Sequence, residues 1–341
     1  MTPKRIAVVG ARGYSGLELI RILNHHPLIQ KVSAFATQNF KLSQWPKVDC
    51  HTLEHLPEAD ADLVFLATPA ETSLELAPQC LKRGQSVVDL SGAFRLKTHS
   101  YAEHYRFEHT SPEWLKEARY GLQPWLQDHS IPTSGPVLIA NPGCYATAIL
   151  TALLPVLKDK LIQPNSIVID AKSGTTGAGK KAVESQLFAE VDQDCLPYRI
   201  GRHQHLPEIQ EACLAWSAIQ IDPFMSTSLL PVRRGITAAV YARVQSGVSP
   251  KQIEDSFRQA YVDQPLIRFA AIEDQADLLS LRKVVGTARV HLAYQLMGDK
   301  LYLYSALDNL LKGAASQAVE NMNRIFDWSG HLGLEHLEAL A

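Results

Sequence analysis

The sequence predicts an α/β protein with two domains: a doubly wound parallel sheet, followed by an α+β domain with a largely antiparallel sheet. Within residues 1–143, short and nearly continuous apolar runs alternate with helical patterns, as in parallel sheets whose strands are buried on both faces. Within residues 144–308 the strand-like runs are longer, and two of them flank Gly298-Asp299, a hairpin turn signal. With 341 residues and 46% hydrophobic content, the chain can bury a large core.

The elements follow from the spacing of apolar residues. The first domain is expected to contain strands at residues 5–9, 31–36, 63–67, 86–90 and 137–140, and helices near 16–24 and 72–83. The second is expected to contain strands at 166–171, 237–244, 288–296 and 300–306, and helices at 146–154 and 251–261. Apolar positions between residues 313 and 326 have helical spacing and predict a final helix.

Charge and cysteine content argue against several classes of protein. Charged residues make up 20% of the chain and the net charge is −2, so no broad electrostatic feature favours nucleic acid or an anionic membrane. The five cysteines are scattered and form no C-x-x-C pair, which suits free thiols in a reducing cytoplasm. The chain has no apolar run of about 18 residues and enters a strand at once, so we expect neither a membrane span nor a signal peptide.

Residues 6–19 have the pattern of a strand, a glycine-rich turn and a helix. Gly10 allows the tight turn, Gly13 lets a phosphate approach the backbone, and Gly16 permits close packing of helix on strand. The spacing is G-x-x-G-x-x-G, and its position directly after the first strand favours a Rossmann-like dinucleotide site with the diphosphate at the helix N-terminus. The alternative is a plain βα turn whose glycines serve only its geometry.

The end of the second strand indicates which nicotinamide cofactor is bound. An acidic side chain there would bind the ribose 2′-hydroxyl of NAD. Residues 33–41 contain no carboxylate, whereas Thr37, Gln38 and Lys41 offer polar and cationic groups to a 2′-phosphate. We therefore expect NADP rather than NAD. The alternative is a loop whose Lys41 is merely solvated.

Cys144 lies where the apolar run ending at Ala140 gives way to a helical run, with Pro142 and Gly143 at the turn. A thiol at a helix N-terminus adjoins N–H groups that lack intrahelical partners and the positive end of the helix dipole, which favour the thiolate. The same N–H groups can hold a developing oxyanion. This setting predicts a nucleophile for acyl chemistry, whereas the residue type alone would favour a buried packing thiol.

A nucleophilic thiol usually needs an imidazole nearby, and residues 201–209 supply His203 and His205 together with an arginine and Glu208. Two alternatives stay open at this point. Zinc could bind His203, His205 and Glu208, although a convincing fourth ligand is lacking. The segment could also be a solvated polar loop.

Residues 173–180, SGTTGAGK, superficially resemble a phosphate-binding loop of the ATPase type, but Lys181 stands where Ser or Thr would bind magnesium. A backbone nest beside the nicotinamide or the substrate fits these residues better. Arg95 and the pair Arg233-Arg234 could clamp a phosphate or a carboxylate, although each is individually more often a surface ion-pair residue.

Together these segments resemble the N-acetyl-γ-glutamyl-phosphate reductases, the arginine-biosynthesis branch of the semialdehyde dehydrogenase group. The matching strings occur in order over nearly the whole chain: GARGYSGLEL (10–19), LATPAETS (66–73), SGAFRL (91–96), YGL (120–122), NPGCYATA (141–148), SGTTGAGK (173–180), HQHLPEI (203–209), PVRRGI (231–236) and LDNLLKGAASQAVENMN (307–323). The aspartate-semialdehyde branch shares the glycine loop and the cysteine, but HQHLPEI and LDNLLKGAA resemble the arginine branch.

The resemblance implies roles for residues in these strings. It makes Cys144 the nucleophile and a histidine of the HxHxPE string the acid/base, with His203 slightly preferred to His205. The cofactor-binding residues, including those of the glycine loop, are expected to be Gly10, Arg12, Gly13, Tyr14, Ser15, Gly16, Thr37, Thr68, Pro69, Ser91, Gly92, Ser173, Gly174, Gly177, Ala178, Gly179 and Asn309. The expected substrate-binding residues are Arg95, Asn141, Glu208 and Arg234, and no metal is expected.

Two positions depart from the family pattern. Gln123 follows YGL where the family typically has Glu, so no role is carried onto it, and Arg12 stands where Ser is common. The family also implies that the C-terminal segment 309–341 joins the nucleotide domain 1–143, with Asn309 and Lys312-Gly313 near the cofactor. Residues 144–308 would form the catalytic and dimerisation domain of a homodimer or homotetramer.

The implied activity is the NADP-dependent reductive dephosphorylation of N-acetyl-γ-glutamyl phosphate to N-acetyl-glutamate semialdehyde through a cysteine thioester, with release of inorganic phosphate. Two alternatives stay open: a related reductase acting on aspartyl or aminoadipyl phosphate, and a cofactor-binding regulator without turnover. The thiol and the paired histidines argue against the regulator. We expect no nucleic-acid or membrane partner.

Overall fold

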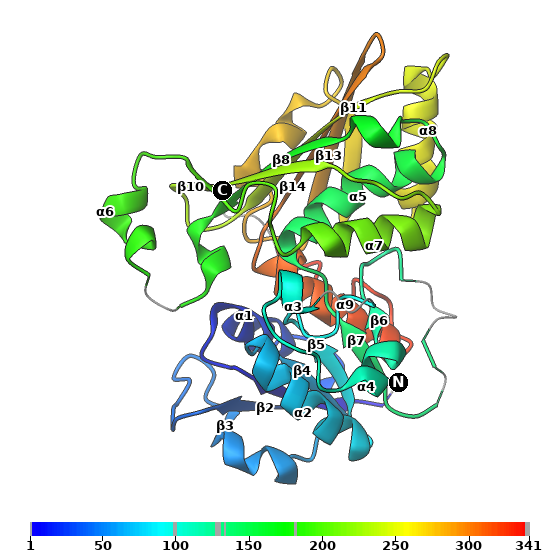
Figure 1. The fold of residues 1–341 in the computed structure, drawn as a ribbon. Helices are drawn as coiled ribbons and strands as arrows, with labels where there is room; N and C mark the ends of the chain where they lie inside the picture. The colour runs from blue at the N-terminus through cyan, green and yellow to red at the C-terminus, as the bar shows by residue number, and fades with distance from the viewer. Residues whose placement is uncertain (1, 98–100, 127–130, 133, 181–182, 338–341) are drawn as a thin grey trace. The chain divides into compact units, whose positions relative to one another are not determined.

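The chain folds into two compact units, each built around its own seven-stranded sheet (Figure 1). The computed structural model describes residues 2–97, 101–126, 131–132, 134–180 and 183–337. The first unit comprises Met1–Gly143 and Ala314–His336, and the second comprises Cys144–Gly313 and Leu337–Ala341. Among the described helices, none has both the length and the apolar character that a membrane crossing requires.

The first unit contains a sheet in which every neighbouring pair of strands is parallel, in the order β3-β2-β1-β4-β5-β7-β6. Its strands are β1 (Lys4–Val9), β2 (Ile29–Ala36), β3 (Asp49–Thr52), β4 (Leu63–Leu66), β5 (Ser86–Asp89), β6 (Arg119–Tyr120) and β7 (Leu138–Ala140). Its helices are α1 (Tyr14–Leu23), η1 (Leu53–Glu58), α2 (Ala70–Lys82), α3 (Tyr101–His104), α4 (Pro112–Glu117) and α9 (Ser316–Ile325). The strand order reverses between β1 and β4, the switch point at which open sheets of this kind bind ligands.

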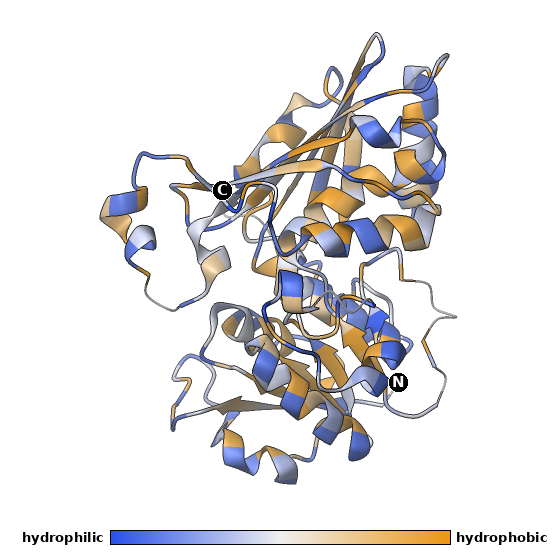
Figure 2. Ribbon diagram, in the orientation of Figure 1, coloured by the Kyte–Doolittle hydropathy of each residue, from blue (hydrophilic) through white to orange (hydrophobic). Residues whose placement is uncertain are grey.

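Hydropathy explains how the first sheet is covered. The strands β4 and β5 are buried along their whole length, and α1 packs against β1, β2 and α9 while α2 packs against β4 and β5. In Figure 2 the central strands of both units are mostly orange, whereas the outer helices alternate between orange and blue. The apolar stripe of each helix therefore meets a sheet whose strands are apolar on both faces.

The second unit contains a mixed sheet in the order β12-β13-β14-β11-β8-β10-β9, in which β12–β13 and β8–β10 are parallel and the other pairs antiparallel. Its strands are β8 (Val168–Gly174), β9 (Leu196–Tyr198), β10 (Phe224–Leu230), β11 (Ile236–Arg243), β12 (Ile267–Ala271), β13 (Val290–Met297) and β14 (Lys300–Leu307). Its α-helices are α5 (Cys144–Lys158), α6 (Phe188–Val191), α7 (Leu206–Ser217) and α8 (Pro250–Tyr261). Shorter helical turns are η3 (Pro164–Ser166), η4 (Thr175–Ala178), η5 (Glu184–Gln186), η6 (Ala276–Leu279) and η7 (Leu281–Lys283).

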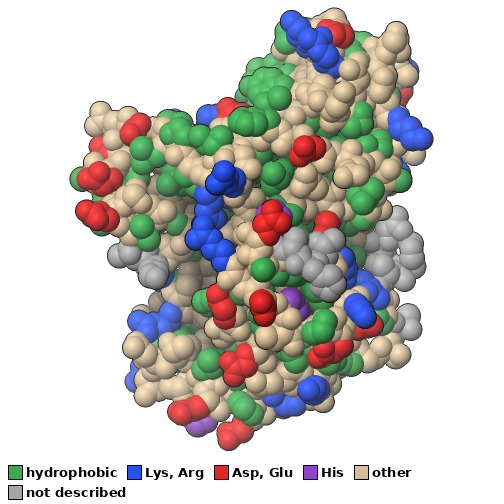
Figure 3. Space-filling model, viewed as in Figure 1, with side chains coloured by type: hydrophobic (Ala, Val, Ile, Leu, Met, Phe, Trp, Pro, Cys, Tyr) green, Lys and Arg blue, Asp and Glu red, His purple; other side chains and the backbone are tan. Residues whose placement is uncertain are grey.

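One face of this second sheet is covered by helices. The helix α5 packs on β11 and β14, with α7 and α8 beside it, and is buried from Tyr145 to Leu157. The opposite face is covered by η6 at the β13–β14 end. Elsewhere this face presents exposed apolar side chains. Figure 3 shows that acidic and basic side chains both occur on the visible surface of each unit.

The predicted fold class is confirmed, and so is the hairpin at Gly298-Asp299. Gly298 has a φ of +61°, and Met297 pairs with Lys300 across the antiparallel β13–β14 turn. The sequence reasoning missed five strands and four α-helices: β3, β6, β9, β10, β12, α3, α4, α6 and α7. The strand β10, FMSTSLL, has no apolar alternation, and it forms because it bonds to β8 and β9 on its two sides. The predicted final helix forms over Ser316–Ile325, while residues 338–341 lie outside the described ranges.

Candidate active site

The glycine turn between β1 and α1 is shaped by close backbone contacts. Gly10 has a φ of +82°, and a Cβ there would lie 2.2 Å from the Ala67 carbonyl oxygen. A Cβ on Gly16 would lie 2.3 Å from the Gly10 oxygen, whereas one on Gly13 would meet only that oxygen, at 3.2 Å. Packing therefore requires Gly10 and Gly16 far more strictly than Gly13. No side chain in the described residues caps α1 at Gly13, so its first turn suits a bound diphosphate.

Arg12 extends from this turn to the end of β2. Its Nη1 donates a 2.9 Å hydrogen bond to Oε1 of Gln38. The end of β2 lies against the turn because the Phe35 carbonyl accepts hydrogen bonds from the backbone N–H groups of Gly10 and Ala11. Thr37, Gln38 and Lys41 are exposed. No carboxylate occurs between residues 37 and 48, so the segment that follows β2 offers polar and cationic side chains but no acidic one.

Three predicted cofactor residues follow other strands of the first sheet. Thr68, after β4, bonds through its hydroxyl to that of Ser73 at 2.8 Å, and Ser91, after β5, donates to the Asp89 carboxylate at 2.8 Å. A Cβ on Gly92 would lie 2.0 Å from the Tyr105 ring, so packing of that ring explains this glycine. The cofactor roles of Thr68, Ser91 and Gly92 stay predictions.

Arg95 is buried in the first unit and bonds to backbone carbonyls. Its Nε donates to the Asn141 oxygen and its Nη2 to the Leu90 oxygen, both at 2.8 Å. These bonds connect the segment after β5 to the segment after β7. The proposed contact of Arg95 with substrate stays a prediction, but the arginine also holds the chain three residues before Cys144.

Cys144 is the first residue of α5, at the boundary between strand-like and helical backbone that the sequence indicates. It is partly exposed, whereas the rest of α5 up to Leu157 is buried. The backbone at Gly313 packs directly on it, since a Cβ on Gly313 would lie 2.8 Å from the Cys144 Cβ. The thiol therefore stands, partly exposed, at the first residue of α5, with little space on the side of Gly313.

His203 and His205 are buried together in the second unit, with 4% and 6% of their surface exposed, so the solvated-loop alternative is wrong. Their ring centres are 4.7 Å apart, and the Tyr145 ring centre lies 5.0 Å from that of His203. The His205 backbone N–H donates to His203 Nδ1 at 3.1 Å, which places the proton of a neutral His203 ring on Nε2. Burial, and secondarily the charge of Arg199, lower the pKa of His203 to about 4, so this imidazole is neutral near pH 7.

Glu208 lies in the first turn of α7, the helix that begins immediately after His205. Its side chain is almost fully buried. Within the described part of the chain no group of three His, Cys, Asp or Glu side chains is arranged to hold a metal ion. The geometry therefore gives no support to the zinc alternative for His203, His205 and Glu208.

Two tyrosines that sequence reasoning did not select lie near the nucleophile. The Tyr198 hydroxyl donates to the Tyr145 hydroxyl at 3.0 Å. Burial is the main cause that raises the pKa of both phenols, that of Tyr198 to about 12, and the negative charge of the Cys144 thiolate raises both further. Both phenols are therefore protonated at neutral pH. Tyr145 follows Cys144 directly in sequence, but no local signal distinguishes Tyr198.

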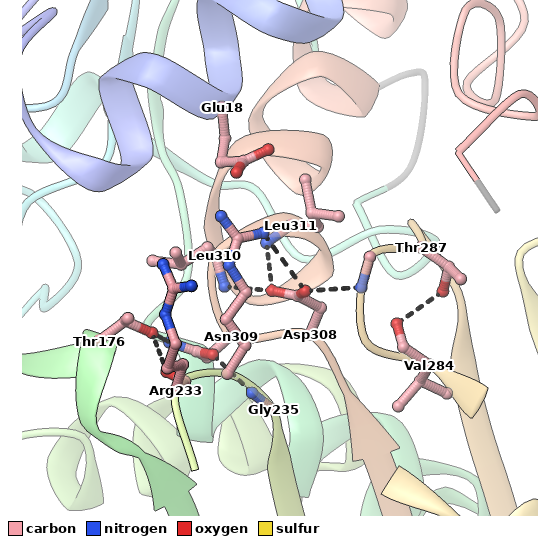
Figure 4. Close-up of polar contacts among 12 residues, drawn as sticks. Glu18, Thr176, Arg233, Gly235, Val284, Thr287, Asp308, Asn309, Leu310 and Leu311 are labelled. Atoms are coloured by element: carbon pink, nitrogen blue, oxygen red, sulfur yellow. Dashed lines mark hydrogen bonds and ion pairs between the residues drawn. The ribbon is translucent and has the colours of Figure 1, made fainter. Parts of the chain in front are cut away.

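Asn309 connects two loops of the second unit (Figure 4). Its Oδ1 accepts a 2.8 Å hydrogen bond from the Gly235 backbone, and its Nδ2 donates to Thr176 Oγ1 at 3.0 Å. A Cβ on Gly174 would lie 2.8 Å from the Arg234 nitrogen, so the loop from 231 to 235 packs tightly on the segment after β8. Gly179, in contrast, has open space around it, and Lys181 lies outside the described residues.

Asp308 holds the neighbouring arginine. Its carboxylate is fully buried and accepts 2.8 Å hydrogen bonds from the backbone N–H groups of Gly286 and Leu310, and Arg234 Nη1 lies 3.6 Å from Oδ2. Burial raises the pKa of Asp308, while the Gly286 N–H bond and the Arg234 charge oppose that rise. Sequence reasoning missed Asp308, although it directly precedes Asn309 in the LDN string.

The predicted residues are thus divided between the two units. The second unit holds the proposed nucleophile, both histidines and one arginine of the substrate set, together with Glu208, the 173–179 segment and Asn309. The first unit holds the glycine turn, the β2 end, Thr68, Pro69, Ser91, Gly92, Arg95 and Asn141.

Comparison with protein families agrees with this division. The model described as "Semialdehyde dehydrogenase, NAD binding domain" matches residues 5–131, and "Semialdehyde dehydrogenase, dimerisation domain" matches residues 144–309. An N-acetyl-gamma-glutamyl-phosphate reductase of Geobacillus stearothermophilus is 38% identical over 97% of this chain and 98% of the relative. A reductase of the same name from Bacillus cytotoxicus is 36% identical over 98% of this chain and 99% of the relative.

Solved structures show the same fold at much lower identity. Aspartate semialdehyde dehydrogenase II from Vibrio cholerae superposes with a TM-score of 0.73 at 17% identity, covering 96% of this chain and 98% of that one. Aspartate semialdehyde dehydrogenase with NADP from Candida albicans gives 0.67 at 13% identity, covering 97% and 100%. The resemblance noted from the sequence is confirmed: the chain belongs to the N-acetyl-γ-glutamyl-phosphate reductase family of the semialdehyde dehydrogenase group.

Proposed function

We propose that this chain catalyses the NADP-dependent reduction of N-acetyl-γ-glutamyl phosphate to the semialdehyde, with Cys144 as nucleophile. The observation that carries this proposal is a partly exposed thiol at the first residue of α5, in the same unit as a buried, neutral His203. The family relationship supports the substrate, since the named relatives cover almost the whole chain.

The chemistry follows from groups of this chain. The Cys144 thiolate attacks the γ-carbonyl carbon, a C–S bond forms, the C–O bond to phosphate breaks, and inorganic phosphate leaves. Backbone N–H groups at the start of α5 stabilise the oxyanion that develops on the carbonyl oxygen. A bound reduced nicotinamide supplies the hydride that takes the thioester to the aldehyde level. The C–S bond then breaks, which releases the semialdehyde and regenerates the thiolate.

His203 is the preferred histidine for this chemistry. Its Nδ1 accepts a hydrogen bond from the His205 backbone N–H, so the ring carries its proton on Nε2. From there it can donate a hydrogen bond to the substrate oxygen while the ring remains neutral. A neutral imidazole that donates in this way adds no positive charge to the buried site. His205 remains the second candidate.

The proposed cofactor is NADP. The glycine turn and the start of α1 would hold its diphosphate, and Arg12, held by Gln38 beside Thr37 and Lys41, would face the 2′-phosphate. A phosphate of about −2 charge is attracted by these cations. The 2′-hydroxyl of NAD would find no carboxylate in residues 37–48 to accept its hydrogen bond. Arg234, braced by Asp308, is the proposed partner of a substrate carboxylate or phosphate.

The proposed assembly is a homodimer formed through the open face of the second sheet. Phe224, Val168 and Tyr241 are 60%, 42% and 46% exposed. They are register partners across β10, β8 and β11, so they form one apolar row on one face. Burying such a row against a second copy would remove it from water. The proposed compartment is the reducing cytoplasm, which suits five cysteines that are all free.

A panel of semialdehydes tests the function. Phosphate-dependent reduction of NADP or NAD is measured with N-acetyl-glutamate, aspartate and aminoadipate semialdehydes. We expect turnover with the first substrate and with NADP, and its loss in Cys144→Ser with cofactor binding retained. A preference for either other semialdehyde would replace the substrate, and normal cofactor binding without turnover on any of them would favour a regulator.

A further inference from the structure

Asp308 directly follows β14 in the second unit, and its two carboxylate oxygens contact different segments of the chain (Figure 4). The side chain is fully buried. Its Oδ1 accepts hydrogen bonds from the backbone N–H groups of Leu310 at 2.8 Å and Leu311 at 3.2 Å. Its Oδ2 accepts a hydrogen bond from the Gly286 N–H at 2.8 Å and lies 3.6 Å from Arg234 Nη1. One buried carboxylate therefore connects the turn after β14 to an arginine of the substrate set.

Arg234 lies in the loop between β10 and β11, residues 231–235, which we call the arginine loop. Asn309 holds the end of this loop, because its Oδ1 accepts a 2.8 Å hydrogen bond from the Gly235 N–H. The Arg234 side chain is 26% exposed, whereas the carboxylate of Asp308 beside it has no exposure. Arg234 can therefore meet an anionic ligand while the buried carboxylate holds its guanidinium in place.

The turn after Asp308 reaches the proposed nucleophile. In the π-helical turn η8 (Leu311–Ala315), the Gly313 N–H bonds five residues back to the Asp308 backbone oxygen at 2.9 Å. A Cβ on Gly313 would lie 2.8 Å from the Cys144 Cβ and 3.3 Å from that oxygen, so the three residues meet at one place. Turns of this type are rare and occur frequently at functional sites. The turn that the Asp308 side chain caps is thus packed on the first residue of α5.

The two oxygens of Asp308 thus hold two groups that the proposed reaction must keep at a fixed separation. Oδ1 caps the turn that packs on Cys144, and Oδ2 holds Arg234. The carboxylate itself stands at the end of β14, which is bonded to β11 and β13 on its two sides and is therefore a rigid support. All these residues belong to the second unit. Since the rate of attack depends steeply on the placement of the reacting atoms, a shift of Asp308 would affect both binding and attack.

We propose that Asp308 is a positioning residue that sets the separation between Arg234 and the Cys144 thiol. It acts on the substrate through Arg234 and on the thiol through the turn that contains Gly313. The proposal rests on the proposed function in two respects, that Cys144 is the reacting thiol and that Arg234 holds an anionic group of the substrate.

Two substitutions separate these two roles. Asp308→Asn keeps an acceptor for the N–H groups of Leu310 and Leu311, but it removes the negative charge beside Arg234. Asp308→Ala removes the charge and the acceptor together. The two variants therefore share the loss at Arg234 and differ in the cap of the turn that packs on Cys144.

Tyr304→Phe is the matched control, because Tyr304 is a buried residue of the same strand. Its hydroxyl donates a 2.8 Å hydrogen bond to the Leu279 oxygen. Phenylalanine removes that buried bond without changing a contact of Asp308 or Arg234. We expect this variant to lose thermal stability and to keep the kinetic constants and the Cys144 reactivity of the wild type.

The readouts are kcat, the KM values for N-acetyl-glutamate semialdehyde and for phosphate, and the rate at which iodoacetamide alkylates Cys144. Alkylation is followed by peptide mass spectrometry, with the exposed Cys195 as reference in the same sample. We expect Asp308→Asn to raise one of the two KM values by about tenfold and to leave kcat and Cys144 alkylation close to wild type.

Asp308→Ala should raise the same KM and also lower kcat by about 10- to 100-fold, the scale of an ångström-size displacement. It should slow Cys144 alkylation as well, because a displaced thiol loses the N–H groups that favour the thiolate. On an Arg234→Met background, Asp308→Asn should raise that KM by less than about twofold more, since the carboxylate acts on the substrate through Arg234.

Four results would overturn the proposal: wild-type KM values in Asp308→Asn, Cys144 alkylation at or above the wild-type rate in Asp308→Ala, fully additive effects of Asp308→Asn and Arg234→Met, or changes of the same size in Tyr304→Phe. If Asp308→Ala does not fold, Asp308→Asn and the double variant decide the proposal. Alkylation needs no turnover, so activity retained in Cys144→Ser would reject the proposed function independently of the alkylation result.

Discussion

Acidification from about pH 7.5 to about pH 5 should weaken folding by about 2 kcal/mol through His203 alone. The folded protein holds this imidazole 96% buried, next to His205 and Tyr145, and its pKa is about 4 against an ordinary 6.5. The His203 imidazole therefore takes up its proton near pH 6.5 in the unfolded chain but only near pH 4 in the folded protein. Stability from this residue is fully present above pH 6.5 and is lost as the pH falls toward 4.

The magnitude comes from the two pKa values. At pH 5 the unfolded imidazole is almost fully protonated and the folded one almost entirely neutral, so the free-energy difference approaches about 1.5 pKa units, or roughly 2 kcal/mol. Because burial is the principal cause of the lowered pKa, salt should change this value little.

The assay is urea unfolding, followed by circular dichroism, of wild type and His203→Gln at several pH values between these limits. The variant should lose about 2 kcal/mol less than wild type over the same range. His291, whose pKa burial also lowers to about 4, contributes equally in both proteins and cancels in the comparison. Parallel loss of stability in the two proteins, or an NMR titration of His203 near pH 6.5, would refute the reasoning.

Three further substitutions are expected to separate the parts of the site. Gly313→Ala places a methyl group 2.8 Å from the Cys144 Cβ, so the thiol must shift and kcat should fall by about 100-fold. An unchanged kcat together with an unchanged rate of thiol alkylation would contradict that contact. Arg12→Ser should weaken the binding of NADP by about tenfold and leave the binding of NAD unchanged, as measured by fluorescence titration. Equal weakening of both cofactors would mean that Arg12 contacts a part of the cofactor other than the 2′-phosphate. Arg234→Met removes the cation beside buried Asp308, and we expect the KM for the substrate to rise by about tenfold. A change in kcat alone would argue against a contact between Arg234 and the substrate.

Much of the fold could be predicted from the sequence because its signals are local. The runs that became β1, β4 and β5 are apolar on both faces, which is sufficient for a buried parallel strand, and the glycine pattern after β1 marks the turn at the switch point. The position of Cys144 at the start of α5 was also readable, because Pro142 and Gly143 separate a strand from a helix within a few residues.

The sequence by itself therefore determined the fold class and the family, and it supplied the candidates for the chemistry, since each depends on neighbours close along the chain. The tertiary structure decided what surrounds them. His203 owes its low pKa to burial beside Tyr145, and Asn321 meets Asn141 across 180 positions of sequence. Local pattern carries no information about such contacts, because a side chain's burial and hydrogen-bond partners are set by segments that only folding brings together.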